Sequence, residues 1–349
     1  MMRALWAIGM GLCITTGCSD DGPRSAGPPA HDAGHDADAN HDADANHDAD
    51  AGSEQDAAPD QADGQVLPEC PTFAAPVERG RLSAEELDEI SGLAVSRSNP
   101  RVLWMHNDSG DSARIFAVRD DGTYLGTFAL DGAQAIDWEE LATGPGREPG
   151  TTGLYVADIG NNALELREAV VYRVTEPAID PDVGYNAVLT DVERFPLTYP
   201  DGPSGETDPD RGHNAEALFV EPPSGDLILV TKASGGARVY RARAPLSPFG
   251  NALELVTVLR FGQPPLGDDA LVTAGDLSPA GEVALRTESS AFLWRGDAAG
   301  VSRALEREAC PIPLALEPQG ETLAFLPDGS GYFTVSEGDA SALYFYARQ

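Results

Sequence analysis

The sequence predicts an all-β fold: a single β-propeller of five four-stranded blades, with the ring closed by an N-terminal strand. Short runs of β-branched and aromatic residues recur in groups of four and are separated by tight turns, which is typical of propeller blades. The 349-residue chain contains 37 Gly and 27 Pro, which favours many turns over a helical bundle. No apolar run with helical periodicity extends convincingly over ten residues.

Each repeated unit consists of up to four short strands separated by tight turns. The first three units are complete, and the last two show three strands each. The predicted strands are 89–95, 102–108, 114–118 and 124–130; 137–142, 154–158, 170–174 and 192–197; 214–220, 226–232, 238–241 and 253–259; 273–277, 283–287 and 291–294; and 319–325, 332–336 and 343–346.

The fifth unit ends at the C-terminus after three strands, so its sheet needs a fourth strand from elsewhere. The segment 76–82, before the first unit, is suited to supply it, because closing the ring with a strand from the other terminus removes open sheet edges. Six blades are the alternative, with the extra blade in the long stretch 177–213, which we otherwise interpret as an acidic surface loop.

The chain has four cysteines, of which Cys13 belongs to the leader. Cys70 and Cys310 are an even pair in a chain that we expect to be exported, which predicts one disulfide between them. Cys70 leads into the closing strand and Cys310 lies near the outer strand of the fourth unit, so the bond would staple the ring closure. Two free buried thiols are the alternative.

The N-terminal segment predicts export and anchoring. Residues 1–17 combine Arg3 with an apolar stretch too short to span a membrane, as in a signal peptide. The small residues before Cys18 resemble the bacterial lipobox, which implies that Cys18 carries lipid and that the protein is anchored in the cell envelope, more readily in the outer than in the inner membrane. An ordinary secretory signal is the alternative.

Residues 18–65 are expected to form a disordered acidic tether ahead of a propeller domain at 66–349. The tether repeats H-D-A-D-A-N, and it carries 13 acidic residues against a single base, Arg24. It contains no large apolar side chain between 19 and 65, so burial cannot offset the entropy of ordering it. A weak sink for Zn²⁺, Ni²⁺ or Cu²⁺ is the alternative use of its histidines and aspartates.

The formal net charge of -34 argues against nucleic-acid binding and against electrostatic docking on anionic lipid. The folded part from residue 65 onward accounts for -23 of it. No nucleotide-binding or redox motif is present, which predicts no such cofactor. We expect a monomer that contacts the membrane through its lipid alone and binds an envelope protein or a small molecule.

Acidic or amide residues recur around the first-strand leucine of each unit. Because first strands lie innermost in a propeller, these side chains are expected to form an acidic ring around a central funnel. Lys232 and Arg286 are candidate counter-charges, and a hard cation, Ca²⁺ first, is the predicted occupant. The alternative is that these side chains accept hydrogen bonds from backbone amides of neighbouring blades. The candidate ring residues are Glu89, Glu139 with Glu140, Asn214 with Glu216, Asp276 and Glu321.

Two equivalent loops, 106–111 and 158–162, follow second strands and are rich in Asp, Asn and Gly. They add possible oxygen ligands on one face, or they are simply Asx turns. His106 and His213 are the only histidines of the folded part and could flank one cleft as general bases, as could Glu216; two exposed turn histidines are the alternative. The ligand candidates in these loops are Asn107, Asp108, Asp158 and Asn161.

Five segments together resemble a family of uncharacterised exported bacterial propeller proteins: E-I-S-G-L-A at 89–94, W-M-H-N-D-S-G-D at 104–111, D-W-E-E-L-A at 137–142, Y-V-A-D-I-G-N-N at 155–162 and N-A-E-A-L at 214–218. The architecture is more distantly similar to gluconolactonase-like and phytase-like propellers, which hold an axial metal with carboxylates and amides. The sequence therefore predicts an envelope propeller that binds a ligand or protein partner through an acidic funnel. A Ca²⁺-dependent lactonase, esterase or phosphoesterase is the alternative.

Overall fold

The computed structural model describes residues 69–161, 168–180, 182–200, 213–233, 236–260, 271–296 and 300–349. The chain divides into two units, Met1–Gln65 and Val66–Gln349. The predictions about the leader, Cys18 and the tether lie outside the described residues. Within them, the fold is built from strands and one short helix, α1 (Val301–Ala304).

The strands pair into five antiparallel sets of four. The first three sets are β2 (Ile90–Val95), β3 (Val102–Asn107), β4 (Arg114–Arg119) and β5 (Tyr124–Leu130); β6 (Trp138–Pro145), β7 (Thr152–Asp158), β8 (Ala169–Thr175) and β10 (Glu193–Thr198); and β11 (Ala215–Glu221), β12 (Asp226–Thr231), β13 (Ala237–Ala242) and β14 (Asn251–Leu259). The last two are β15 (Val272–Leu277), β16 (Val283–Thr287), β17 (Ala291–Trp294) and β18 (Cys310–Ile312); and β19 (Ala324–Phe325), β20 (Gly331–Val335), β21 (Ala342–Ala347) and β1 (Val77–Arg81).

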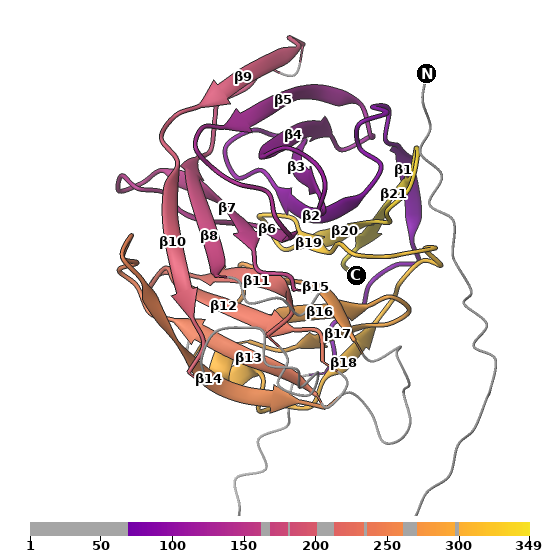
Figure 1. The fold of residues 1–349 in the computed structure, drawn as a ribbon. Helices are drawn as coiled ribbons and strands as arrows, with labels where there is room; N and C mark the ends of the chain where they lie inside the picture. The colour runs from indigo at the N-terminus through magenta and orange to yellow at the C-terminus, as the bar shows by residue number, and fades with distance from the viewer. Residues whose placement is uncertain are drawn as a thin grey trace, which may run out of the picture. The chain divides into compact units, whose positions relative to one another are not determined.

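The first strands of the sets form a closed ring of contacts. β2 contacts β6 and β19, β11 contacts β6 and β15, and β15 contacts β19, so every first strand touches the first strands of two neighbouring sets. Figure 1 shows the sheets fanning outward from these strands. The predicted β-propeller is therefore confirmed.

The N-terminal strand completes the last sheet, as predicted. β1 pairs antiparallel with β21, with Val77 opposite Phe345 and Arg81 opposite Ala342. The chain thus closes its ring by main-chain hydrogen bonds between β1 and the C-terminal strand, so β21 is paired on both sides and β1 is the outer strand of the sheet.

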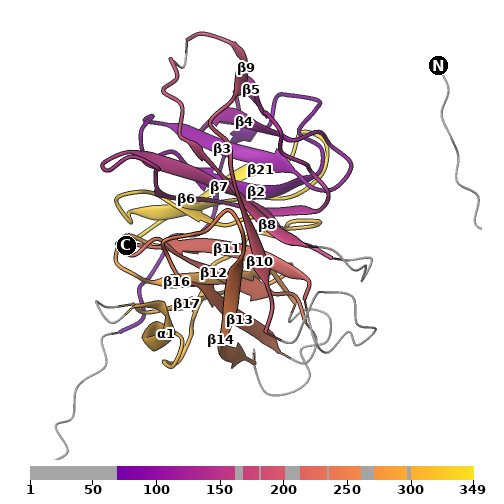
Figure 2. The ribbon, with the colours of Figure 1, turned by 60° about the vertical axis from the view of Figure 1, so that its left-hand side comes forward.

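Two further pairings connect the sets at their outer side. β9 (Tyr185–Leu189) adds to the first set by running parallel to β5, and β10 runs parallel to β14 where Leu197 lies opposite Asn251. The second pairing joins the second and third sets into one eight-stranded sheet, with β10 and β14 adjacent in Figure 2. The described part of 177–213, where a sixth blade was the alternative, thus supplies strands to the first and second sets; residues 201–212 lie outside the described residues.

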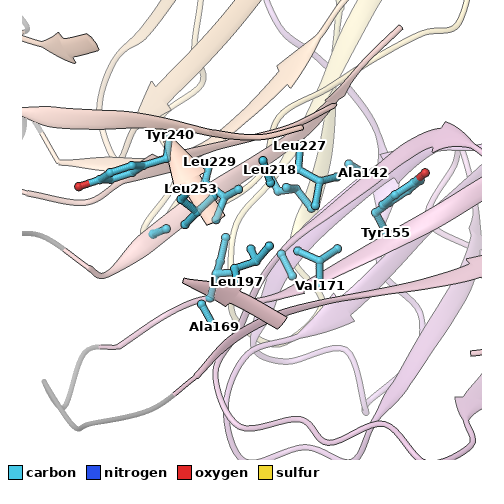
Figure 3. Close-up of a cluster of buried hydrophobic side chains, with 14 of the residues drawn as sticks. Ala142, Tyr155, Ala169, Val171, Leu197, Leu218, Leu227, Leu229, Tyr240 and Leu253 are labelled. Atoms are coloured by element: carbon cyan, nitrogen blue, oxygen red, sulfur yellow. The ribbon is translucent and has the colours of Figure 1, made fainter. Parts of the chain in front are cut away.

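Apolar side chains fill the spaces between neighbouring sets. Figure 3 shows one such cluster between the second and third sets, in which Val171 and Leu197 approach Leu218 and Leu253. Each fully buried leucine of this kind contributes about 1.5–3 kcal/mol through its removal from water. Inner strands such as β2 and β3 are buried along their whole length, so their sequences lack the strict alternation of apolar and polar residues that a half-exposed strand shows.

The predicted disulfide is present. Cys70 and Cys310 are bonded, with their Cα atoms 5.7 Å apart and a sequence separation of 240. Cys310 opens β18, the outer strand of the fourth set, and Cys70 lies shortly before β1. The bond therefore ties the segment that enters the closing strand to the neighbouring sheet.

Candidate functional site

In each of the first four sets, the first strand has a β-bulge near its start. The bulge determines which side chain of that strand leaves the ladder. The pairing register shifts once in β2, β6, β11 and β15, in each case across a single intervening residue. In the fifth set Gly320 bridges Ser336, and the residue after it takes the same position. A bulge leaves its extra residue outside the ladder and re-aims its side chain. The five equivalent residues are Ser91, Glu139, Glu216, Thr273 and Glu321.

Three carboxylates come close enough to share one metal ion. Asp108 follows β3, Asp137 precedes β6, and Glu139 is the bulge residue of β6. One oxygen from each lies within 4.8 Å of the other two. The Asp108 amide donates to the Glu89 carbonyl at 2.7 Å, which continues the β2–β3 ladder by one pair. This bond fixes the position of the Asp108 backbone. Carboxylate oxygens at this spacing are the ligand type that hard cations prefer.

Glu139 is held in place from two sides. It is only 1% exposed, and the Ser91 hydroxyl donates to its Oε2 at 3.3 Å and to its backbone carbonyl at 2.9 Å. A Cβ built on Gly160 would lie 1.9 Å from Glu139 Oε1, so a glycine is needed there to make room for the carboxylate. Within the described part of the chain, the buried Oε1 receives no hydrogen bond from an N–H or hydroxyl donor, and the Glu139 carboxyl is hydrogen-bonded to that of Glu216. A buried acceptor without a donor is costly unless a ligand satisfies it.

The surrounding carboxyl groups favour their protonated forms. Burial, together with the negative charges of Glu216 and Asp108, raises the pKa of Glu139 well above its usual value. Burial likewise raises the pKa of Asp108 to about 6. Glu337, whose carboxyl is hydrogen-bonded to that of Glu321, has its pKa raised to about 9, chiefly by burial. Like charges brought together away from water are destabilising unless protons or cations neutralise them.

A hydrogen-bonded chain of side chains runs across the third set. The backbone N–H of Asn161 donates to Asn214 Oδ1, and Asn214 Nδ2 donates to Glu216 Oε1 at 3.0 Å. The other oxygen of Glu216 lies 3.3 Å from the Lys232 ammonium. Burial alone would lower the pKa of Lys232, but the carboxylates of Glu216, Glu321 and Glu139 raise it above its usual value. Burial raises the pKa of Glu216 to about 7 despite this partner.

We call this group the inner cluster. Its members share mutual electrostatic effects and lie at the bulge positions or directly beside the first and second strands. The inner cluster consists of Asp108, Asp137, Glu139, Glu216, Lys232, Glu321 and Glu337.

Several predicted ligands lie at the border of this cluster. Glu89 is exposed just before β2, although its charge acts on Asp108 and Glu337. Asp158 ends β7 and accepts a hydrogen bond from the Asp137 amide at 3.0 Å, so it positions a ligand candidate. Asn107 Nδ2 donates to Asp111 Oδ2 at 3.3 Å. Its buried Oδ1 has no partner among the described residues.

Asp276 lies elsewhere on its strand. Its two oxygens accept hydrogen bonds from the Leu277 amide at 2.7 Å and the Phe325 amide at 2.8 Å. Burial raises its pKa to about 6. The register of β15 places Thr273, and not Asp276, at the level of Glu139 and Glu216. Asp276 thus caps backbone amides, which was the alternative role considered for the acidic residues.

The two histidines have different surroundings. His106 is completely buried, its ring 5.3 Å from that of Trp138 and in edge contact with it, so the alternative of an exposed turn histidine is wrong for this residue. Its Nδ1 lies 3.0 Å from the Asn107 carbonyl, and burial lowers its pKa. His213 is half-buried and stacks on Tyr199 with ring centroids 4.2 Å apart.

The two candidate counter-charges also differ. Lys232 belongs to the inner cluster, whereas Arg286 is fully buried and pairs with Glu317 at 2.6 Å.

The sequence did not single out Asp137 and Glu337 as ligands. Asp137 opens the D-W-E-E-L-A segment, and Glu337 follows its second strand as Asp108 follows β3. Alignment of the five units by strand position would have found both.

No family model matches the chain, and no curated protein matches it in sequence. Solved structures resemble it at low scores. A virginiamycin B lyase from Staphylococcus aureus in complex with quinupristin is 11% identical, with a TM-score of 0.34, and the match covers 74% of this chain and 66% of the lyase. A luciferin-regenerating enzyme is 10% identical, with a TM-score of 0.39, and coverage is 78% and 95%. Raptor from Chaetomium thermophilum is 11% identical, with a TM-score of 0.39, and coverage is 80% and 29%.

At these scores the fold assignment depends on the strand pairing, and the neighbours carry no argument about function. Among the described residues, no helix has the length and apolar character required to cross a membrane.

Proposed function

We propose that this protein is an exported, lipid-anchored β-propeller whose inner cluster binds a divalent cation, Ca²⁺ first, and through it a ligand or protein partner. The observation that carries the proposal is the group of three carboxylates, Asp108, Asp137 and Glu139, with one oxygen of each within 4.8 Å of the other two. The buried Oε1 of Glu139 receives no hydrogen bond from an N–H or hydroxyl group of the described residues. A cation at this point would coordinate Glu139 Oε1 and would also neutralise the negative charge of the neighbouring carboxylates.

The residues fit a hard cation by their chemistry. Every candidate ligand offers oxygen, and the three carboxylates come from two neighbouring sets, so their separation can adjust to the flexible coordination of Ca²⁺. Asp108, Asp137 and Glu139 would hold the ion, and the bound ion would supply a positive centre for oxygen donors of a ligand. Lys232 neutralises the third-set side of the cluster through Glu216, which leaves the side of the first and second sets for the cation.

Export is supported by the Cys70–Cys310 bond, because disulfides persist in oxidising compartments. The proposed anchor is Cys18, and the proposed location is the bacterial cell envelope. The cation site and the anchor are independent parts of the proposal and are tested separately.

Terbium luminescence tests the cation site directly. Trp138 lies between Asp137 and Glu139 in β6 and is 1% exposed, so a Tb³⁺ ion bound in place of Ca²⁺ should be sensitised by its indole. We expect Tb³⁺ emission on excitation of tryptophan, displacement by Ca²⁺, and a rise in Tm with Ca²⁺. Wild-type protein without emission and without a Ca²⁺-dependent Tm would overturn the proposal.

Glu139→Gln and Glu140→Gln form a matched pair. Both side chains are 1% exposed and both have a pKa raised well above the usual value, chiefly by burial. Glu140, however, accepts hydrogen bonds from the Leu141 and Gly275 amides at 3.0 and 3.1 Å and lies outside the inner cluster. We expect Glu139→Gln to lose the Tb³⁺ signal and Glu140→Gln to keep it, with far-UV circular dichroism confirming that both variants fold.

A hydrolase is the second candidate, and Glu216 is the observation that favours it. A buried carboxyl group with a pKa raised to about 7 is poised to exchange a proton at neutral pH. A bound cation would supply charge stabilisation for a lactone, ester or phosphoester, and Glu216 would accept or donate the proton. Chromogenic esters and phosphoesters test this: turnover lost with chelator and with Glu216→Gln supports the enzyme, and Tb³⁺ binding without turnover of any substrate refutes it.

A further inference from the structure

A cavity lies at the turn that joins β2 and β3, the opposite end of this hairpin from Asp108. It has a volume of about 320 Å³ and lies between the β2–β3 turn of the first set and the β19–β20 turn of the fifth. Its walls include Val95, Val102, Leu326 and Phe333, of which all but Leu326 are buried in the core. This volume is near the lower end of the ~300–1,000 Å³ found for small-molecule sites, so the cavity suits a ligand with a short apolar body.

The charged residues at this cavity differ in whether a neighbouring side chain or backbone amide already pairs with them. The Arg101 guanidinium holds Asp120 with two contacts of 2.8 and 3.0 Å, which neutralises both. Asp328 accepts the Ser330 amide at 2.9 Å, and this bond lowers the pKa of its carboxyl. Arg97 also lines the cavity; its charge partly offsets the rise in the pKa of Asp276, but it makes no ion pair or hydrogen bond with a described residue.

The turn that carries Arg97 is fixed before any ligand arrives. Glu176 accepts hydrogen bonds from the Ser96 hydroxyl, from the Ser98 hydroxyl at 2.7 Å and from the Trp104 indole at 2.9 Å. Asn99 adds a hydrogen bond to the Pro177 carbonyl at 2.9 Å. A preformed turn spares a ligand the entropy of ordering it, and so strengthens binding.

We propose that this cavity binds a small amphipathic anion, whose apolar chain packs against the Val95 and Phe333 walls and whose carboxylate pairs with Arg97. A guanidinium is a preferred partner for a carboxylate because two of its N–H groups can donate in parallel. This site is independent of the inner cluster and of the cation, so its test does not depend on the proposed function.

Calorimetry with three probes of equal chain length tests the proposal on the purified full-length chain. Octanoate, 1-octanol and octylammonium share the apolar body and differ in the charge of the head. We expect octanoate to bind about tenfold more tightly than octanol, the factor that about 1.4 kcal/mol of charge-assisted hydrogen bonding provides. Octylammonium should bind more weakly still.

Variants then assign the site. Arg97→Gln should weaken octanoate about tenfold, to the level of octanol, and leave octanol unchanged. Arg79→Gln, at an exposed arginine of β1 that does not line the cavity, should change neither. Leu326→Trp should fill the cavity and weaken all probes; if it fails to fold by circular dichroism, Arg97→Gln still decides.

Three outcomes would overturn the proposal. Octanoate without measurable binding would mean that the cavity holds no such ligand. Equal affinity for all three probes would mean apolar adsorption only. Octylammonium as the tightest probe would mean that Asp328, and not Arg97, selects the head group.

Discussion

Replacing Gly160 with alanine should abolish cation binding without disturbing the backbone. Gly160 does not adopt a positive φ, so alanine suits its conformation. The added Cβ would meet Glu139 Oε1 at 1.9 Å, and the carboxylate would have to retreat by about 1.5 Å to reach the ordinary contact distance of 3.4 Å. Metal sites tolerate departures of only about 0.2 Å in ligand distance, so this retreat should remove Glu139 from the coordination sphere.

The magnitude follows from linkage. At a Ca²⁺ concentration a hundred times the wild-type Kd, a bound ion stabilises the fold by about 2.7 kcal/mol, and a hundredfold weaker variant retains only about 0.4 kcal/mol. For a domain of this size the difference is a loss of roughly 5 °C from the Ca²⁺-induced rise in Tm. Differential scanning calorimetry with Ca²⁺ and with chelator measures it, and Tb³⁺ emission gives an independent value.

Gly184→Ala is the matched control. Gly184 also lacks a positive φ, and a Cβ there would meet no atom within 4 Å. It should keep the full Ca²⁺ response. If Gly160→Ala folds with a normal Tm in chelator and still binds Ca²⁺ as tightly as wild type, then Glu139 is not a ligand and the reasoning from the three carboxylates is refuted.

Three further predictions concern the rest of the chain. Replacing Cys70 and Cys310 with serine should lower the unfolding free energy by up to about 5 kcal/mol, because the bond closes a loop of 240 residues; guanidinium titration checks this, and an unchanged midpoint would contradict it. Because the pKa of Asp276 is raised from 3.8 to about 6 in the folded state, its contribution to stability is fully present below pH 4 and is lost as the pH rises through 6; Asp276→Asn should flatten that decline, by at most about 3 kcal/mol, in urea titrations at pH 4 and pH 7. Cys18→Ala should move the chain from the detergent phase to the aqueous phase in Triton X-114 partitioning, and equal partitioning of both forms would refute the lipid anchor.

The repeat architecture was predictable because the strand runs and their turns carry it locally. The first strands and the closing strand at 76–82 followed from the order of the units and from the incomplete fifth unit, and the Cys70–Cys310 bond followed from an even pair of cysteines in a chain expected to be exported. The parallel additions of β9 and β10 were not predictable in this way, since each depends on a partner strand far along the chain. Local patterns identify a strand, but its outer neighbour is chosen by tertiary packing.

The site was predictable only in part, because the bulges change which residue points inward. Sequence order suggests Glu89 and Asp276 as members of the ring, but the register shifts place Ser91 and Thr273 at the equivalent positions. The extra residue of a bulge lies outside the ladder, so its position cannot be counted from the alternation of the strand. Glu139, Glu216 and Glu321 were identified because their units place a carboxylate at the bulge itself.

The pairing of β10 with β14 has a consequence for how this ring could change in evolution. Where neighbouring repeats touch only through side chains, one repeat can be lost or duplicated without breaking main-chain hydrogen bonds at the junction. Here Leu197 and Thr198 of the second set are laddered to Asn251 and Ala252 of the third. Gain or loss of a repeat is therefore more easily accommodated elsewhere in the ring, and we expect the second and third sets to be inherited together. We also expect them to open as one unit in hydrogen exchange.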